Sequence, residues 1–272
     1  MNLYAVGCSF THGHGALPGP ANVCKHGDFV VNTHGKFDYA WPWQLEPHFD
    51  TVINDGYQGS GNDYVLRRTL RMLAHLDPAE ISDWVFVIQL SVPQRKEFLD
   101  SASNMFYQVL YHEMFDHLQE GSDQPLKYKN FAEFTAYETH NTQLTDQQKH
   151  YAAGFYYHCW HEEFILYEHF RDLLLMTEIL ENKKCKYLIT GMCSMDFVPE
   201  HILLNYNLKN RYTVNYINLL KTHNQLIGIS ELLHKLDPSQ SNLIAPCGHP
   251  NELGHQAVAE YILDEIKQRG WL

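Results

Sequence analysis

The sequence contains no long uninterrupted run of apolar residues. A helix that crosses a bilayer needs about 20 such residues in succession, and no segment of the 272 residues approaches that length. The opening residues, MNLYAVGCSF, also lack the basic start and the extended apolar segment of a secretory signal peptide. We therefore expect a cytoplasmic protein that is not inserted in a membrane.

Basic residues are scarce as well. The chain has 20 Lys and Arg against 32 Asp and Glu, which gives a formal net charge of -12. An acidic surface repels phosphate backbones and anionic lipids. This charge balance argues against nucleic acid and membrane surfaces as partners. The oligomeric state has no signature in the sequence.

Cysteine motifs and nucleotide-binding motifs are missing too. The 6 Cys form no CxxC pair, so we expect reduced thiols and no disulfide framework. The glycines at 56, 59 and 61 do not have the GxGxxG spacing of a dinucleotide site. Four histidines near the N-terminus could bind zinc, but no HExxH motif accompanies them, and the prediction is no metal and no cofactor. These histidines are His12, His14, His26 and His34.

Short apolar runs that alternate with helical patterns are present. Strands are expected at residues 3–7, 51–54, 84–90 and 187–190, and a further strand or an irregular segment at 212–217. Helices are expected to begin at Trp41 and to span 62–75, 162–180 and 251–267. This alternation predicts one domain over residues 1–272, a three-layer α/β/α sandwich with a central parallel sheet. The segment 84–90, WVFVIQL, has the continuous apolar character of a strand that is buried on both faces.

A segment at about 97–160 does not follow the alternation. It is rich in Tyr, Phe and His, with apolar patches at 105–118 and 131–138 that have helical spacing. We predict an inserted helical cap or lid.

Two residues at opposite ends of the chain could form a catalytic pair. Ser9 follows the first strand in the turn Gly7-Cys8-Ser9-Phe10-Thr11, and His249 precedes Pro250 just before the last helix. Because ligands of parallel sheets bind at the carboxyl ends of the strands, both residues are expected at the same edge. A nucleophilic hydroxyl needs a nearby base, which His249 would supply. Each residue alone is weak evidence, since a Ser in such a turn is usually a capping residue.

Taken together in order, these blocks resemble the SGNH (GDSL-like) hydrolase family. The family has a Gly-Asp-Ser block after its first strand and a His-Pro block before its last helix, which match Gly7-Cys8-Ser9 and His249-Pro250. The segment 54–59, NDGYQG, resembles the second block of the family, an Asn followed by a Gly five positions later. Trp41-Pro42, before the second strand, resembles the sequences of the phage and bacterial branch of the family. The resemblance implies a flavodoxin-like hydrolase fold that covers the chain except the insert.

The resemblance also implies a mechanism. Ser9 would attack an ester carbonyl with His249 as general base, and the backbone N–H groups of Ser9 and Gly59 would hold the oxyanion. The family usually has an Asp three residues before the His, where this chain has Pro246. A backbone carbonyl, a water or a distant acid would then orient His249. The Asn that follows the family's third strand is also missing, and Asn62 or Ser91, or else Gln89, could replace it as a donor.

The function that follows is a serine esterase that hydrolyses a small acyl ester, with an O-acetyl group on a carbohydrate as one substrate class. Two alternatives stay open. A chain without the usual Asp and Asn could bind a ligand or glycan without turning it over. An acyltransferase would use the same acylation machinery and differ only in the alcohol that resolves the acyl-enzyme.

Overall fold

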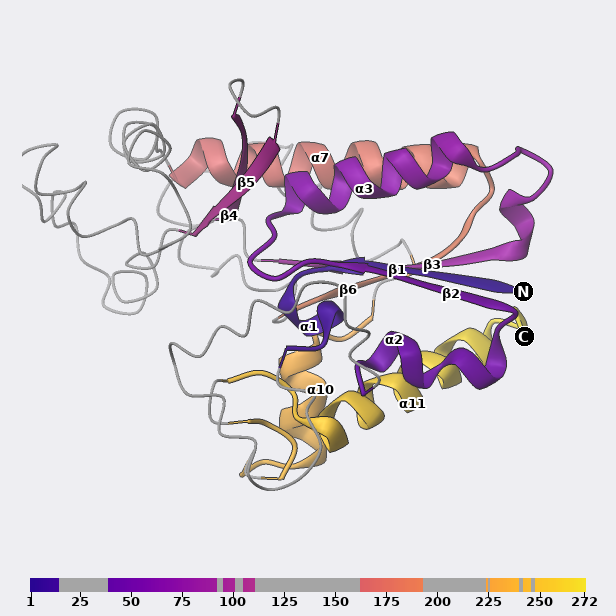
Figure 1. Cartoon of the computed structure of the whole chain (residues 1–272), viewed down its shortest axis with the longest axis vertical. Coiled ribbons are helices and arrows are strands. Elements are labelled where there is room, and N and C mark those ends of the chain that lie inside the picture. The colour runs from indigo at the N-terminus through magenta and orange to yellow at the C-terminus, as the bar shows by residue number, and fades with distance from the viewer. Residues whose placement is uncertain are drawn as a thin grey trace, which may run out of the picture.

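A central parallel sheet organises the chain (Figure 1). In the computed structural model, the residues described are 1–14, 39–91, 95–100, 105–110, 162–192, 224, 226–239, 242–245 and 248–272. The sheet has the order β2-β1-β3-β6, and every pair of neighbours is parallel. The four strands are β1 (Asn2–Gly7), β2 (Thr51–Gly56), β3 (Trp84–Leu90) and β6 (Lys186–Gly191). This order is that of flavodoxin-like sheets, in which the switch point for ligands lies between the first and third strands.

Helices cover both faces of the sheet, as the predicted α/β/α sandwich requires. Helices α3 (Asn62–His75) and α7 (Glu162–Asn182) lie on one face (Figure 1). The other face carries α2 (Trp41–Gln44), α10 (Ile229–Leu236) and α11 (Glu252–Gln268). Two short 3-10 turns, η1 (Glu46–His48) and η2 (Ile81–Asp83), precede β2 and β3. The predicted three-layer architecture is confirmed.

The side chains of each central strand divide between two hydrophobic cores. In β1, Leu3 and Ala5 pack into the core beneath α11, whereas Tyr4 and Val6 pack into the core beneath α3 and α7. All seven residues of β3 are buried, because both of its neighbours and both helical layers cover it. The continuous apolar run at 84–90 is therefore a central strand, as predicted.

The start of the predicted helical insert is a β-hairpin instead. Strand β4 (Arg95–Asp100) pairs antiparallel with β5 (Met105–Leu110). The prediction of helix at 105–118 is thus wrong over 105–110, where the sequence MFYQVL has the aromatic and β-branched residues that strands prefer. A short apolar run cannot be assigned to helix or strand by spacing alone. The patch at 131–138 and the possible strand at 212–217 lie outside the described residues.

No helix within the described ranges is long and apolar enough to span a membrane.

Candidate active site

Ser9 begins a short helix directly after the central strand β1. Helix α1 (Ser9–His12) has Cys8 as its N-cap residue. The carbonyl of Cys8 accepts hydrogen bonds from Thr11 N at 3.1 Å and from His12 N at 2.9 Å. The first N–H groups of a helix have no acceptor inside it, so this turn directs donors to the carboxyl edge of the sheet. Ser9 itself is buried, with 3% of its surface exposed.

The side chain of Gln89, on the neighbouring strand β3, holds this turn by hydrogen bonds. It is fully buried in β3, and its Oε1 accepts from Cys8 N and from Thr11 Oγ1, both at 3.0 Å. Its Nε2 donates to Cys8 Sγ at 3.3 Å. A Cβ on Gly7 would lie 2.4 Å from Thr11 Oγ1 and 2.5 Å from Gln89 Oε1, so only glycine fits there. The sequence suggested Gln89 only as an oxyanion donor; its role beneath the turn depends on the pairing of β1 with β3.

His249 lies on a loop whose position is fixed by backbone hydrogen bonds. Its carbonyl accepts from Ala245 N at 2.8 Å, and Asn251 N donates to Leu243 O at 3.0 Å on the other side of the bridge between Ile244 and Pro250. Asn251 then caps α11, because its side chain accepts from Gly254 N at 3.0 Å. The position of Pro246, where the family has its Asp, lies outside the described residues.

The structure brings the two predicted catalytic residues into contact. His249 Nε2 lies 2.8 Å from Ser9 Oγ, although 240 positions separate the two residues. Cys8 Sγ is the other neighbour of this hydroxyl, at 3.9 Å, so the imidazole nitrogen is much the closer acceptor. In the tautomer that accepts the Ser9 proton, His249 carries its own proton on Nδ1. This is the contact that a Ser–His nucleophile needs.

The turn with Gly59 lies against the same end of β1. Tyr57 N and Ser60 Oγ both donate to the carbonyl of Gly7, at 2.9 Å and 3.0 Å. Gly59 has a φ of +77°, which favours glycine, and the space beside its Cα is open. The turn is thus fixed to the strand end that precedes Ser9, and the role of the Gly59 N–H as an oxyanion donor stays a prediction.

Asn62 and Ser91, the other two predicted donors, are bonded to one another. Ser91 N donates to Asn62 Oδ1 at 2.8 Å, and Asn62 Nδ2 donates to Ser91 O at 2.9 Å. Asn62 Nδ2 also lies 2.9 Å from His169 Nδ1 of α7. Arg95 Nη1 donates to Ser91 Oγ at 3.1 Å. These contacts hold α3, β3 and α7 together, and a role of Asn62 in the oxyanion site stays a prediction.

Two of the four N-terminal histidines, His12 and His14, lie within the described residues. His12 and His14 follow Ser9, and burial lowers the pKa of each imidazole. His26 and His34 lie outside the described residues. Across the described ranges, no three side chains of His, Cys, Asp or Glu gather as a metal site would require.

No family model matches the chain, and neither does any curated protein. The chain is similar to two solved structures over nearly its whole length. One is a member of the lipolytic protein G-D-S-L family from Veillonella parvula DSM 2008, at 14% identity and a TM-score of 0.44, with 97% of this chain and 96% of that chain covered. The other is a proposed lipolytic protein of the G-D-S-L family from Desulfitobacterium hafniense DCB-2, at 14% identity and a TM-score of 0.42, with 97% and 98% covered.

Proposed function

We propose that the chain is a serine esterase that hydrolyses a small acyl ester, with Ser9 as nucleophile and His249 as general base. The single observation that carries this proposal is the 2.8 Å separation between Ser9 Oγ and His249 Nε2 at the carboxyl edge of the parallel sheet. A hydroxyl and an imidazole at this distance can exchange the proton that attack on a carbonyl requires. The resemblance to SGNH hydrolases supports the same pair.

The reaction would proceed through an acyl-enzyme. As the Ser9 oxygen attacks the ester carbonyl, its proton passes to His249 Nε2, and the backbone N–H groups of Ser9 and Gly59 hold the oxyanion. His249 then gives the proton to the departing alcohol. A water molecule, deprotonated by the same nitrogen, then attacks the acyl carbonyl. The bond to Ser9 Oγ breaks, the acid leaves, and His249 returns the proton to Ser9. Removing one oxyanion donor from such a site costs about 3 kcal/mol of transition-state stabilisation.

A fluorophosphonate probe, which phosphonylates activated serines, tests the pair directly. We expect labelling of the wild type, mapped to Ser9 by peptide mass spectrometry, and none in Ser9→Ala. His249→Gln should slow labelling by about 10²- to 10⁴-fold, because the general base is lost. Ser239→Ala, at an exposed turn, is the matched control and should label as the wild type does.

Labelling and turnover distinguish the alternatives. A folded wild type that does not label would contradict the esterase and favour a ligand- or glycan-binding protein. With an ester substrate in place of the probe, an acyl-enzyme released faster by an added alcohol than by water would indicate an acyltransferase.

A further inference from the structure

His14, just beyond α1, contacts three parts of the candidate site. Its backbone N–H donates to the carbonyl of Ser9 at 3.0 Å. Its ring packs against the ring of His249, with centroids 4.3 Å apart and an interplanar angle of 63°. Its Nδ1 lies 3.3 Å from Gln58 Nε2, in the turn that carries Gly59. One residue thus joins the segment of Ser9, through its backbone, with His249 and the Gly59 turn, through its ring.

The contact with Gln58 fixes the state of the His14 ring. An amide nitrogen only donates, so Nδ1 of His14 accepts and its proton resides on Nε2. Burial lowers the pKa of His14, which keeps the ring neutral at neutral pH. A neutral ring can lie against His249 without repelling the imidazolium that forms when the base takes the Ser9 proton.

Ring contacts to His249 matter because they act on the orientation of the base. The terminal torsion of histidine has broad minima, and a rotation of the ring would carry Nε2 away from the hydroxyl. Phe10 contacts the His249 ring as well, with centroids 5.1 Å apart at 64°. The segment from Phe10 to His14 therefore supplies two of the rings that hold His249 in place.

The geometry points to His14 as a positioning residue for His249: its ring holds the imidazole against Ser9, and its bond to Gln58 ties that ring to the Gly59 turn. This inference rests on the proposed function and extends it. The effect would be on orientation of the base, so it should change kcat and leave KM nearly unchanged.

Three variants separate ring packing from hydrogen bonding. His14→Ala loses both contacts, His14→Phe keeps a ring against His249, and Gln58→Ala removes only the hydrogen bond. With p-nitrophenyl acetate as substrate and the active sites counted by fluorophosphonate titration, we expect kcat of His14→Ala to fall about 10- to 100-fold, since small misplacements cost this much. KM should stay within about two-fold, and His14→Phe should recover most of the rate.

The coupling between His14 and Gln58 is tested in the same series. If the two act through one contact, adding Gln58→Ala to His14→Phe should lower kcat no further. His48→Ala, at an exposed histidine of η1, is the control for loss of an imidazole. Its kcat should match the wild type.

The outcomes distinguish this inference from the proposed function. A wild type that labels at Ser9, together with a His14→Ala variant of unchanged kcat per titrated site, overturns the role of His14 alone. A variant that only melts earlier, with His14→Phe no better than His14→Ala, also overturns it. A folded wild type with neither labelling nor hydrolysis overturns the proposed function, and this inference with it.

Discussion

At the scale of single residues, the turn that carries Ser9 depends on Gln89. Gln89 is fully buried, and its side-chain oxygen Oε1 accepts hydrogen bonds from Cys8 N and from Thr11 Oγ1, each at 3.0 Å. Buried donors that lose their acceptor destabilise a protein, because they were hydrogen-bonded to water in the unfolded chain. The position of Ser9 is thus set partly by a side chain of the neighbouring strand.

Replacing Gln89 should therefore disturb both the stability of the protein and the position of Ser9. We expect Gln89→Leu to lower the free energy of unfolding by about 1–3 kcal/mol and to slow fluorophosphonate labelling of Ser9. Urea unfolding and labelling kinetics measure the two effects. Gln89→Glu retains an acceptor oxygen for Cys8 and Thr11, so it should label faster than the Leu variant. Labelling of Gln89→Leu at the wild-type rate would contradict this role.

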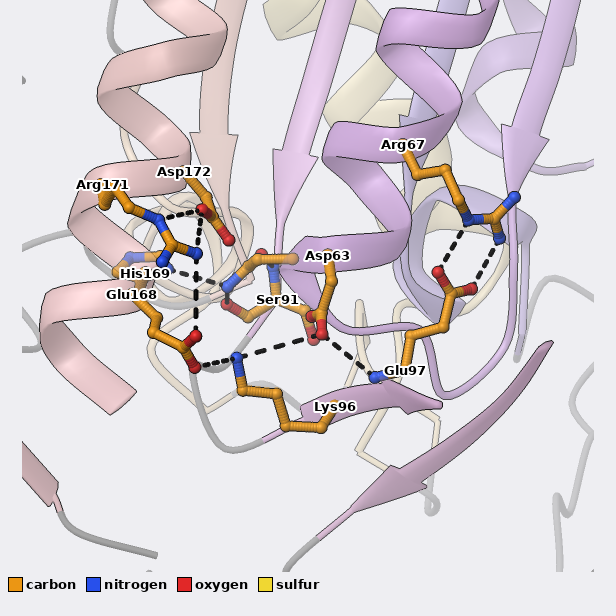
Figure 2. Close-up of polar contacts among 10 residues, drawn as sticks. Asp63, Arg67, Ser91, Lys96, Glu97, Glu168, His169, Arg171 and Asp172 are labelled. Atoms are coloured by element: carbon orange, nitrogen blue, oxygen red, sulfur yellow. Dashed lines mark hydrogen bonds and ion pairs between the residues drawn. The ribbon is translucent and has the colours of Figure 1, made fainter. Parts of the chain in front are cut away.

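At the scale of elements, ion pairs fasten the β4–β5 hairpin to the helices above the sheet. Lys96 Nζ of β4 lies 3.0 Å from Glu168 Oε2 of α7 and 3.9 Å from Asp63 Oδ2 of α3. Glu97 N donates to Asp63 Oδ2 at 3.2 Å. Figure 2 shows how these side chains meet between the three elements. Desolvation raises the pKa of Asp63, which is consistent with its place inside this contact.

The pair of Arg67 and Glu97 offers a test of this attachment. Arg67 Nε and Nη2 donate to the two carboxylate oxygens of Glu97 at 2.7 Å and 2.6 Å, and the Glu97 side chain is only 3% exposed. Arg67→Ala removes the bidentate Arg67 contact from that buried carboxylate. We expect a loss of about 3 kcal/mol in unfolding free energy, the lower end for a buried pair, because the Arg67 side chain is 32% exposed.

Glu97→Gln removes the buried charge and should cost less than Arg67→Ala. Equilibrium unfolding in urea of both single variants and the double variant gives the coupling energy. Equal losses of unfolding free energy in Arg67→Ala and Glu97→Gln would contradict this expectation. They would show that the buried Glu97 charge is not the main cause of the destabilisation.

At the scale of the whole molecule, buried histidines make stability depend on pH. Burial lowers the pKa of His255, in α11, and of His169, in α7, to about 4 each. His255 is fully buried, and its Nδ1 accepts from Trp41 N at 3.3 Å. In the unfolded chain, each of these histidines has the usual pKa near 6.5. Between about pH 6.5 and pH 4, the unfolded chain therefore binds more protons than the folded protein does.

Stability should therefore be unaffected by these groups above about pH 6.5 and fall as the pH drops towards 4. A displacement from about 6.5 to about 4 corresponds to about 3 kcal/mol for His255. We expect His255→Asn, which cannot titrate but can still accept from Trp41, to flatten the dependence of unfolding free energy on pH. His48→Gln, at an exposed position, should leave the slope as in the wild type. Urea unfolding at several pH values measures both.

The sequence alone determined the four strands of the sheet and, apart from α10 (Ile229–Leu236), the helices that cover it. The apolar spacing of these elements reflects burial on one face or on both. The sequence also determined that Ser9 and His249 would share one edge, since parallel strands all end on the same side. The 2.8 Å contact between them agrees with that expectation.

Only the tertiary structure decided which side chains meet at that edge. The support of Cys8 by Gln89, the mutual bonds of Asn62 and Ser91, and the packing of His14 on His249 all join residues from different elements. Which residues become partners depends on strand order and register, and the local spacing of apolar residues carries no information about either. The β4–β5 hairpin was mispredicted for a related reason: a six-residue apolar run suits helix or strand equally, and pairing with a second strand settles the choice.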